Sequence, residues 1–200
     1  MSVAVITKML PMVRWEPGAK DRLRAAALDL YAERGFEQTT ATDIAQAAGV
    51  TERTFFRHFA DKREVLFDGQ EQLQAVFVEA VSKASDEAAT IEVVAQAVAS
   101  AAAFFNDDQR PHSRTRQTVI DANPGLQERE LLKLAALARA VASALTDRGV
   151  SEPQAVLAAE VGVAVFGVAF RQWIAADEDR SFGDIAKDLF RDLTDLTSKA

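Results

Sequence analysis

Arg53 and Arg57 are four residues apart, which would place their side chains one turn apart on a helix. A guanidinium group can donate two hydrogen bonds together to O6 and N7 of guanine in the major groove of DNA. When successive residues are placed about 100° apart around a helix axis, both arginines point away from the apolar stripe that Phe55 and Phe59 form. This spacing predicts a helix that buries two aromatic rings and reads base edges with two arginines.

Neighbouring side chains extend this predicted contact surface. Thr54 lies on the same side of the helix, Phe56 lies on its flank, and Thr51 and Glu52 come at its start. Groups that can bond phosphate oxygens also occur here, namely Thr39, Thr40, Thr51, His58 and Lys62. We expect these five residues to hold the DNA backbone. For His58, a packed imidazole at the end of the helix is the alternative.

Two short helices on either side of a Gly-Val-Thr turn would position these side chains, in the layout of a helix–turn–helix DNA reader. The first helix should begin near Thr40 or Thr42, whose hydroxyls can accept hydrogen bonds from first-turn N–H groups. It should end at Gly49, which has no Cβ and suits a left-handed cap. Thr51 then provides the N-cap of the second helix. An ordinary helical hairpin with charges on its solvent side is the alternative interpretation.

The segment from Asp21 to Phe67 resembles the DNA-binding domain of the TetR family of transcriptional regulators. The resembling runs are Ala-Leu-Asp-Leu-Tyr-Ala-Glu-Arg-Gly-Phe (27–36), Thr-Thr-x-x-Asp-Ile-Ala-x-x-Ala-Gly-Val-Thr (39–51) and Thr-Phe-Phe-Arg-His-Phe-x-x-Lys-x-x-x-Leu (54–66). The family commonly has a tyrosine where this chain has Phe56. Phe56 can offer only apolar contact, for example to a thymine methyl group.

The charge of the chain is unevenly distributed. Its formal net charge is −7, but residues 1–68 hold 10 basic and 10 acidic side chains, and residues 69–200 hold 13 and 20. All the excess negative charge therefore lies outside the predicted reading segment. A neutral domain can still bind phosphates if its basic groups share one face. The candidates are Lys20, Arg22, Arg24, Arg53, Arg57, Lys62 and Arg63. For each of them except Arg53, Arg57 and Lys62, a scattered solvated charge is the favoured alternative.

Composition and pattern predict an all-α fold, because alanine, leucine, glutamate and arginine are plentiful and strand-type alternation is absent. We expect a flexible N-terminal arm over 1–17, a helix–turn–helix domain over 18–64 and an effector-binding and dimerisation domain over 65–200. Nine helices are predicted: 19–34, the pair between 40 and 59, 61–83, 90–105, 113–121, 125–147, 152–176 and 182–197. The helix over 61–83 would link both domains as a rigid rod.

The helix predicted over 152–176 carries two apolar stripes. Large residues such as Phe166 and Trp173 form one stripe, which we expect to face the core of its own chain. Smaller residues form the other stripe, where an identical helix could pack closely across a two-fold axis. The predicted dimer interface comprises Ala158, Gly162, Val165, Ala169 and Gln172, together with Leu189, Leu193 and Leu196 of the last helix. The alternative is that both stripes are buried within one monomer.

The TetR resemblance implies a homodimer that reads a palindromic operator in double-stranded DNA, and a pocket for a small-molecule effector in the larger domain. Candidate lining residues are Phe77, Phe104, Phe105, His112, Arg116, Phe166, Phe170 and Trp173. For each aromatic residue, plain core packing is the alternative. Repression is the family's common mode. The effector would bind better to the state whose heads are wrongly spaced for DNA and so lower operator affinity.

Catalytic and metal-binding patterns are missing from the sequence. There is no cysteine, and the two histidines, His58 and His112, have no metal-binding spacing. We therefore expect no enzyme activity, no cofactor and no metal. The apolar opening of the chain is too short to span a bilayer, so we expect a cytoplasmic protein without membrane contact. One rival interpretation is a helical small-molecule-binding or adaptor protein that keeps the fold without specific operator binding. The other is a non-specific, architectural DNA binder, which would need a broad basic surface that this acidic chain does not show.

Overall fold

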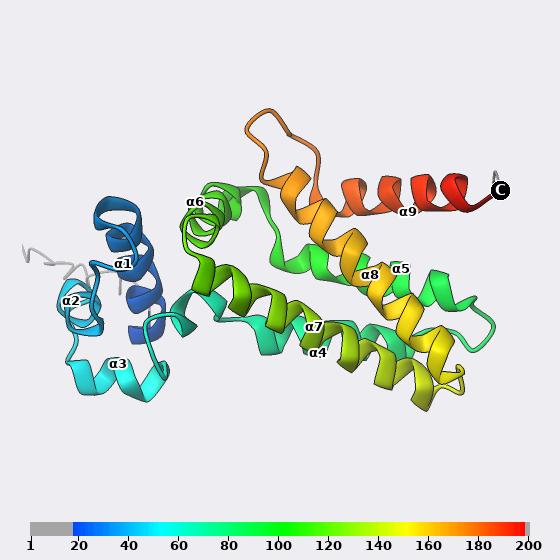
Figure 1. Cartoon of the computed structure of the whole chain (residues 1–200), viewed down its shortest axis with the longest axis horizontal. Coiled ribbons are helices and arrows are strands. Elements are labelled where there is room, and N and C mark those ends of the chain that lie inside the picture. The colour runs from blue at the N-terminus through cyan, green and yellow to red at the C-terminus, as the bar shows by residue number, and fades with distance from the viewer. Residues whose placement is uncertain (1–17, 199–200) are drawn as a thin grey trace, which may run out of the picture.

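The computed structural model describes residues 18–198, and the predicted arm over 1–17 lies outside them. Three helices, α1 (Ala19–Arg34), α2 (Ala41–Ala47) and α3 (Glu52–His58), form a small unit that we call the head, at the left of Figure 1. The head continues into a larger helical bundle through the short 3₁₀ turn η1 (Glu64–Phe67).

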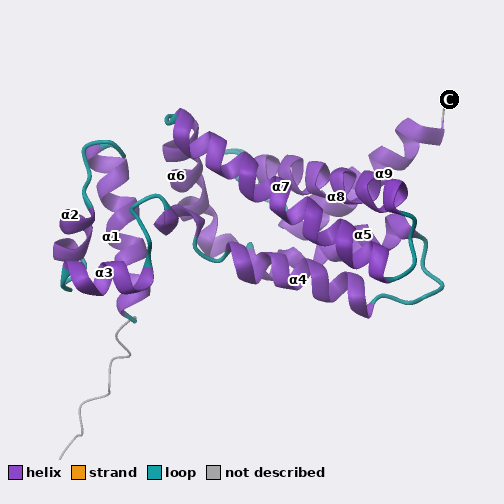
Figure 2. Cartoon of the chain, turned by 60° about the horizontal axis from the view of Figure 1, so that its bottom comes forward, coloured by secondary structure: helices purple, strands orange, loops and turns teal. Residues whose placement is uncertain are grey.

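The bundle contains α4 (Gln70–Lys83), α5 (Thr90–Ser100), α7 (Pro124–Asp147), α8 (Glu152–Trp173) and α9 (Phe182–Ser198). The 3₁₀ turns η2 (Ala101–Phe104) and η3 (Asp107–Gln109) lead into α6 (Arg110–Asp121), which lies between the head and the bundle (Figure 1). Figure 2 shows that helices and loops make up the whole of the described chain, so the predicted all-α fold and its nine α-helices are confirmed for residues 18–198.

Capping residues explain where the head helices begin and end. The Thr40 hydroxyl accepts a hydrogen bond from the Asp43 backbone N–H at 3.1 Å, and the Asp43 carboxylate accepts one from the Thr40 N–H at 2.9 Å. This reciprocal capping box fixes the start of α2. Gly49 follows α2 with a φ of 66°, a left-handed conformation that favours glycine. Thr51 then caps α3, as predicted.

The predicted continuous helix over 61–83 is wrong. The Asp61 carboxylate accepts hydrogen bonds from the backbone N–H groups of Arg63 and Glu64, at 2.8 and 3.1 Å, and starts only the single turn η1. The chain then breaks at Gly69, whose φ is 89°, before α4 begins. The link between head and bundle is thus not one rigid rod. We call residues 64–69, which form this link, the joint.

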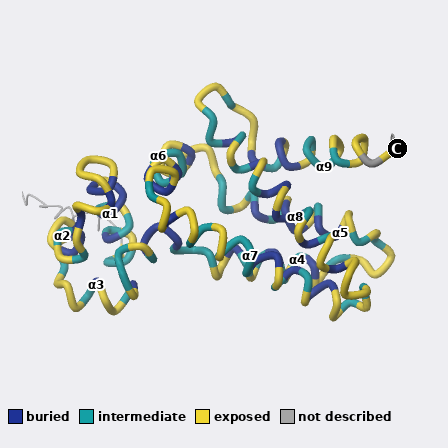
Figure 3. The backbone as a smooth tube through the Cα atoms, in the orientation of Figure 1, coloured by how far each residue is buried: buried dark blue, intermediate teal, exposed yellow. Residues whose placement is uncertain are grey.

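Two apolar clusters hold the molecule together, and Figure 3 marks buried residues in dark blue in both the head and the bundle. The head cluster contains the predicted α1 residues Leu23, Ala27, Leu30 and Tyr31. It also contains Val65, Leu66 and Phe67 of η1, and Val119, Ile120 and Leu126 from the α6–α7 corner. Residues beyond the predicted boundary at 64 therefore complete the core of the head.

The small stripe of α8 does not form an exposed face, which corrects the predicted dimer surface. An added Cβ at Gly162 would lie 2.4 Å from Cγ1 of Val94 on α5. Gly162, Val165 and Ala169 are buried, and Ala158 and Gln172 are half-buried. The stripe packs within the protomer because α5 runs alongside α8. The exposed side of α8 instead carries Leu157, Ala164 and Val168.

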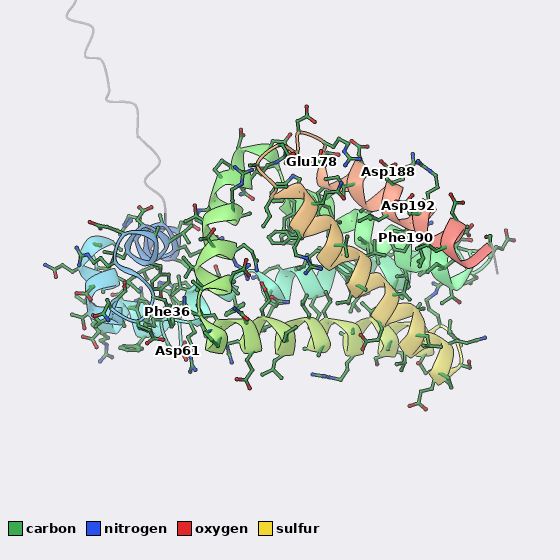
Figure 4. The ribbon with its side chains drawn as sticks, turned by 45° about the horizontal axis from the view of Figure 1, so that its top comes forward. Phe36, Asp61, Glu178, Asp188, Phe190 and Asp192 are labelled. Carbon is green, nitrogen blue, oxygen red and sulfur yellow. The ribbon has the colours of Figure 1, made fainter. Side chains whose placement is uncertain are left out.

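The leucines of α9 that were predicted to lie in the dimer interface differ in exposure. Leu189 is half-buried against the bundle core, whereas the side chain of Leu196 is 78% exposed. Figure 4 shows Asp188, Phe190 and Asp192 along α9. By length and composition, α8 is the only helix among residues 18–198 that could cross a membrane, but its buried residues pack in the bundle core.

Gly162 provides a test of the α5–α8 packing. We expect Gly162→Ala to lower the free energy of unfolding by about 1–3 kcal/mol, because the new methyl group must displace the Val94 side chain. The measurement is urea unfolding followed by circular dichroism at a fixed protein concentration. Gly125→Ala is the matched control, since nothing lies within 4 Å of its added Cβ. Equal stability of the two variants would contradict the packing described here.

Candidate nucleic-acid interface and cavity

The predicted arginine face of α3 lies on the surface of the head. Phe55 is fully buried and Phe59 nearly so, and these rings turn Arg53 and Arg57 outward as expected. Arg53, Thr54, Phe56 and Arg57 line one shallow depression, with the Phe56 side chain 50% exposed. The arrangement offers two cations and an apolar ring on one face, which suits base edges and thymine methyl groups.

Polar residues at the start of α3 cap this helix and join it to α2. The Thr51 hydroxyl accepts a hydrogen bond from the Thr54 N–H at 3.2 Å. The Glu52 carboxylate accepts one from the hydroxyl of Thr42 on α2 at 2.9 Å. Thr40, Thr51 and Glu52 are exposed, so their side chains lie at the surface while they cap or join helices.

Thr39 does not lie on the surface, contrary to its predicted phosphate contact. It is fully buried, and its hydroxyl donates to the Gly35 carbonyl oxygen at 2.9 Å. The physical reason is that the end of α1 leaves carbonyl groups without helical partners, and this hydroxyl satisfies one of them.

Lys62 also has a structural task in place of the predicted phosphate contact. Its ammonium donates to the carbonyl oxygens of Phe36, Glu37 and Thr39, at 2.8, 3.3 and 2.9 Å, which uses all three of its N–H donors. It also lies 4.3 Å from the ring centroid of Phe36. Figure 4 labels Phe36 and Asp61 in this part of the head. Lys62 therefore closes the loop between α1 and α2 onto the end of α3.

Tyr31 reinforces the same closure from the interior of the head. Its hydroxyl donates to the Lys62 carbonyl oxygen at 2.5 Å, and its ring packs edge-on against Phe36. Burial, followed by the negative charge of Asp61, raises the pKa of the Tyr31 hydroxyl. The hydroxyl therefore remains a hydrogen-bond donor throughout the neutral range.

His58 agrees better with the packed-imidazole alternative. The residue is half-buried, and its Nε2 atom is enclosed without a hydrogen-bond partner in the described structure. The ring lies 6.4 Å from that of Phe59. A phosphate cannot reach Nε2 while the imidazole stays in this position.

The remaining basic candidates are occupied by other contacts. Lys20 and Arg24 pair with Asp68, Arg63 pairs with Asp61, and Arg22 donates to the Ala48 carbonyl oxygen. Among the seven candidates, only Arg53 and Arg57 have no hydrogen bond or ion pair with any residue in 18–198. Their guanidinium groups are therefore available to a partner molecule.

A cavity of about 770 Å³ lies where the head meets the bundle. Phe104, Phe105, Phe166 and Phe170 provide an apolar wall, and His112 and Arg116 of α6 provide a polar one. These are six of the eight predicted lining residues. The other two, Phe77 and Trp173, are absent from the lining because both are fully buried in the bundle core.

The opposite wall of the cavity was missed by the sequence analysis. It consists of residues from α1 and the joint, including Lys20, Arg24, Leu28 and Asp68. The sequence offers the basic side chains of α1 only as candidate phosphate contacts or as solvated surface charges, and no local pattern reveals that α1 faces the bundle. Burial, followed by the positive charge of Arg24, lowers the pKa of His112, so this imidazole is neutral at neutral pH. Among residues 18–198, no three His, Cys, Asp or Glu side chains lie close enough together to hold a metal ion.

Two family models match the chain. Residues 23–68 match the model described as "Bacterial regulatory proteins, tetR family", and residues 88–197 match the "MftR C-terminal domain". The first match covers the head and η1, and the second covers most of the bundle, including the α6 and α8 walls of the cavity.

Individual relatives agree with these matches. The chain is 42% identical over 62 residues to the HTH-type transcriptional regulator TcmR of Streptomyces glaucescens. This stretch is 31% of this chain but only 27% of TcmR. It is 26% identical over 153 residues to a Mycobacterium tuberculosis protein named as the mycofactocin biosynthesis transcriptional regulator MftR, which covers 74% of this chain and 76% of that protein. The chain thus spans about a quarter of TcmR and three quarters of MftR.

A solved structure extends the comparison to a bound ligand. FadR of Thermus thermophilus, described as a TetR family transcriptional repressor in complex with lauroyl-CoA, is 25% identical, with a TM-score of 0.50. The likeness covers 86% of this chain and 91% of FadR.

The structural task of Lys62 can be tested by its stability effect. Lys62→Met keeps the length of the side chain but removes the ammonium donor from three carbonyl oxygens, of which only that of Phe36 keeps another donor within residues 18–198, the Thr39 N–H. We therefore expect the free energy of unfolding to fall by about 1–3 kcal/mol. Arg63→Met is the control, because its exposed ion pair with Asp61 should contribute less than about 1 kcal/mol. Chemical denaturation measures both. A Lys62→Met variant as stable as the unmodified protein would contradict the structural task, and Lys62 would again be a candidate for a phosphate contact.

Proposed function

The chain belongs to the TetR family of bacterial regulatory proteins, and on that premise we propose that it is a ligand-responsive transcriptional regulator that binds operator DNA. The observation that carries the proposal is the exposed, unpaired pair Arg53 and Arg57 on the face of α3 opposite Phe55. In this proposal the head, through Phe67, binds DNA in the cytoplasm, where bacterial DNA lies. The rest of the chain senses the effector and dimerises.

Roles for the individual α3 residues follow from their exposure. Arg53 and Arg57 would read guanines, and Phe56 would contact an apolar base edge such as a thymine methyl group. Thr40, Thr51 and Thr54 would position the head on phosphates. Thr39, His58 and Lys62 are left out of this interface, because each is enclosed or engaged inside the head.

We infer that the output is repression relieved by a ligand. Thermus thermophilus FadR, which resembles this chain over most of its length, is described as a repressor and binds lauroyl-CoA. The four phenylalanines of the cavity wall give an apolar surface that suits a long acyl or aromatic group. A ligand that favours heads wrongly spaced for DNA would then release the operator.

A second copy of the chain is the expected partner of the exposed side of α8. Leu157 is 67% exposed and Val168 42%, with Ala164 between them. Glu160 and Arg171 lie on the same side and form no ion pair within residues 18–198. If two α8 helices cross antiparallel near Ala164 and Gly167, Glu160 of one copy faces Arg171 of the other. This face would replace the small stripe of the original prediction.

A symmetric pair explains how so short a reading helix can select a site. One α3 reaches only a few base pairs, whereas two copies would read half-sites about 34–36 Å apart, or a multiple of that distance. The operator would then be palindromic.

Arg57 offers a test of operator reading. We expect selection from random duplexes to give the wild-type protein a palindromic consensus, and Arg57→Ala to lose preference at one position per half-site, at about 1–3 kcal/mol of discrimination. Arg63→Ala is the control, because its side chain pairs with Asp61 and should leave the consensus unchanged. If the wild-type protein enriches no sequence, the rival ligand-binding or adaptor function replaces the regulator.

The α8 face can be tested by exchanging its charges. We expect Glu160→Arg or Arg171→Glu alone to weaken self-association about tenfold, since like charges would face each other, and the double variant to recover it. Sedimentation equilibrium measures the dissociation constants. Glu87→Arg, in the exposed turn after α4, controls for net charge. Single variants that associate as tightly as the wild type, or a double variant that stays weak, would place the interface elsewhere.

A further inference from the structure

The cavity is bounded by the head on one side and by the bundle on the other. We propose that a negatively charged group of the effector binds directly to the head, at Lys20 and Arg24 of α1, together with Arg116 of α6. The proposal rests on the proposed function in one respect, because it takes the ligand of this cavity to be the effector. It names the effector's chemical class as an amphiphile with an anionic head and an apolar tail.

The first observation is that Lys20 and Arg24 already hold an anion at the cavity wall. Asp68, from the joint, lies with its carboxylate oxygens 2.6 Å from Nζ of Lys20 and 3.4 Å from Nε of Arg24. The Asp68 side chain is only 15% exposed, whereas Lys20 and Arg24 are 41% and 42% exposed. Arg24 also has its Nη1 atom 3.8 Å from Oδ1 of Asp21, which lines the same cavity. The two cations therefore keep accessible surface beside the cavity while Asp68 and Asp21 occupy part of their donor capacity.

The second observation is a partly engaged guanidinium on the facing wall. Arg116 donates from Nε to the Leu66 carbonyl oxygen at 2.6 Å and from Nη1 to Glu130 at 3.3 Å. Its Nη2 atom has no hydrogen-bond partner among the described residues and is not enclosed by them. Nη1 also lies 3.4 Å from Oε1 of Gln117. Arg116 lines the cavity with a side chain that is 22% exposed, and its guanidinium keeps donor capacity for an anionic ligand.

The third observation is the separation of polar and apolar walls. Phe105, Phe166 and Phe170 form a contiguous aromatic surface, with ring centroids 5.5–5.8 Å apart. They belong to the bundle, while Lys20 and Arg24 belong to the head. An amphiphile lying across the cavity would bury its tail on the aromatic wall and bring its charged end to α1.

The position of Asp68 gives this binding a mechanical consequence. Asp68 directly precedes Gly69, the left-handed residue at which the chain breaks between head and bundle. An anion that takes over Lys20 and Arg24 competes with Asp68, and so loosens the contact between α1 and the joint. The ligand would then act on the head by putting its own anionic group in the place of the Asp68 carboxylate, without a relay through distant helices.

Calorimetric titration of the full-length chain with three probes tests the proposal. The probes are dodecanoate and lauroyl-CoA, each below its micelle concentration, and uncharged dodecan-1-ol, below its solubility limit. We expect at least one anionic probe to bind at least tenfold more tightly than dodecanol, and the probe that does so identifies a carboxylate or a phosphate source. Equal affinity for dodecanol, or no binding of any probe, would overturn the proposal.

Variants locate the anion. Lys20→Gln combined with Arg24→Gln should weaken the anionic probe about tenfold and leave dodecanol unchanged, whereas Arg34→Gln on the same helix should change neither. Asp68→Asn should have the opposite effect and tighten anion binding about threefold, because it removes the competing carboxylate. A purely structural role for these ion pairs would give no such tightening, and its absence would overturn the proposal even if the double variant folds poorly.

Operator binding is measured separately, by fluorescence anisotropy with the selected duplex. Loss of operator recognition with intact anion selectivity would contradict the regulator function but not the anion site. Operator recognition without anion selectivity would contradict only the anion site.

Discussion

The burial of Phe55 and Phe59 beneath α3 decides which way Arg53 and Arg57 face. Because α3 is only seven residues long, it has little helical stability of its own and depends on this packing. The rings join the α1 residues in the head cluster, and Lys62 and Tyr31 close the chain over the end of the helix. Rotating α3 to bury its arginines would expose two phenylalanines and unseat the Thr51 cap. The outward arginine face is thus a consequence of the aromatic core.

The head is not mechanically independent of the bundle. Val119, Ile120 and Leu126 complete its apolar cluster, and Arg116 bonds the Leu66 carbonyl oxygen within η1. At the other end of α6, Arg110 donates to the carbonyl oxygens of Glu178 and Arg180, in the loop before α9. One helix therefore connects the joint below the head with the loop between α8 and α9.

Local rules allowed the sequence to predict the helices, their caps and the arginine face, since each depends on residues within one or two turns. They failed where a partner distant in sequence decides the outcome. Gly162 has the spacing of a dimer contact, and only the approach of Val94 shows that it packs inside the protomer. Likewise Lys62 looks like a surface cation until α1 and α2 bring three carbonyl groups to it. The prediction of one helix over 61–83 was wrong because it gave more weight to the helix-favouring residues on either side than to Gly69, where the chain breaks.

The most direct test of the account is dimethyl sulfate methylation interference on the selected operator, because the reagent modifies guanine N7 in the major groove and adenine N3 in the minor groove. The account predicts that methylated guanines block binding in two clusters about 10–10.5 base pairs apart, or a multiple of that spacing, one for each α3 helix of a symmetric pair. Interference confined to adenines of the minor groove, or a single unpaired cluster, would contradict it.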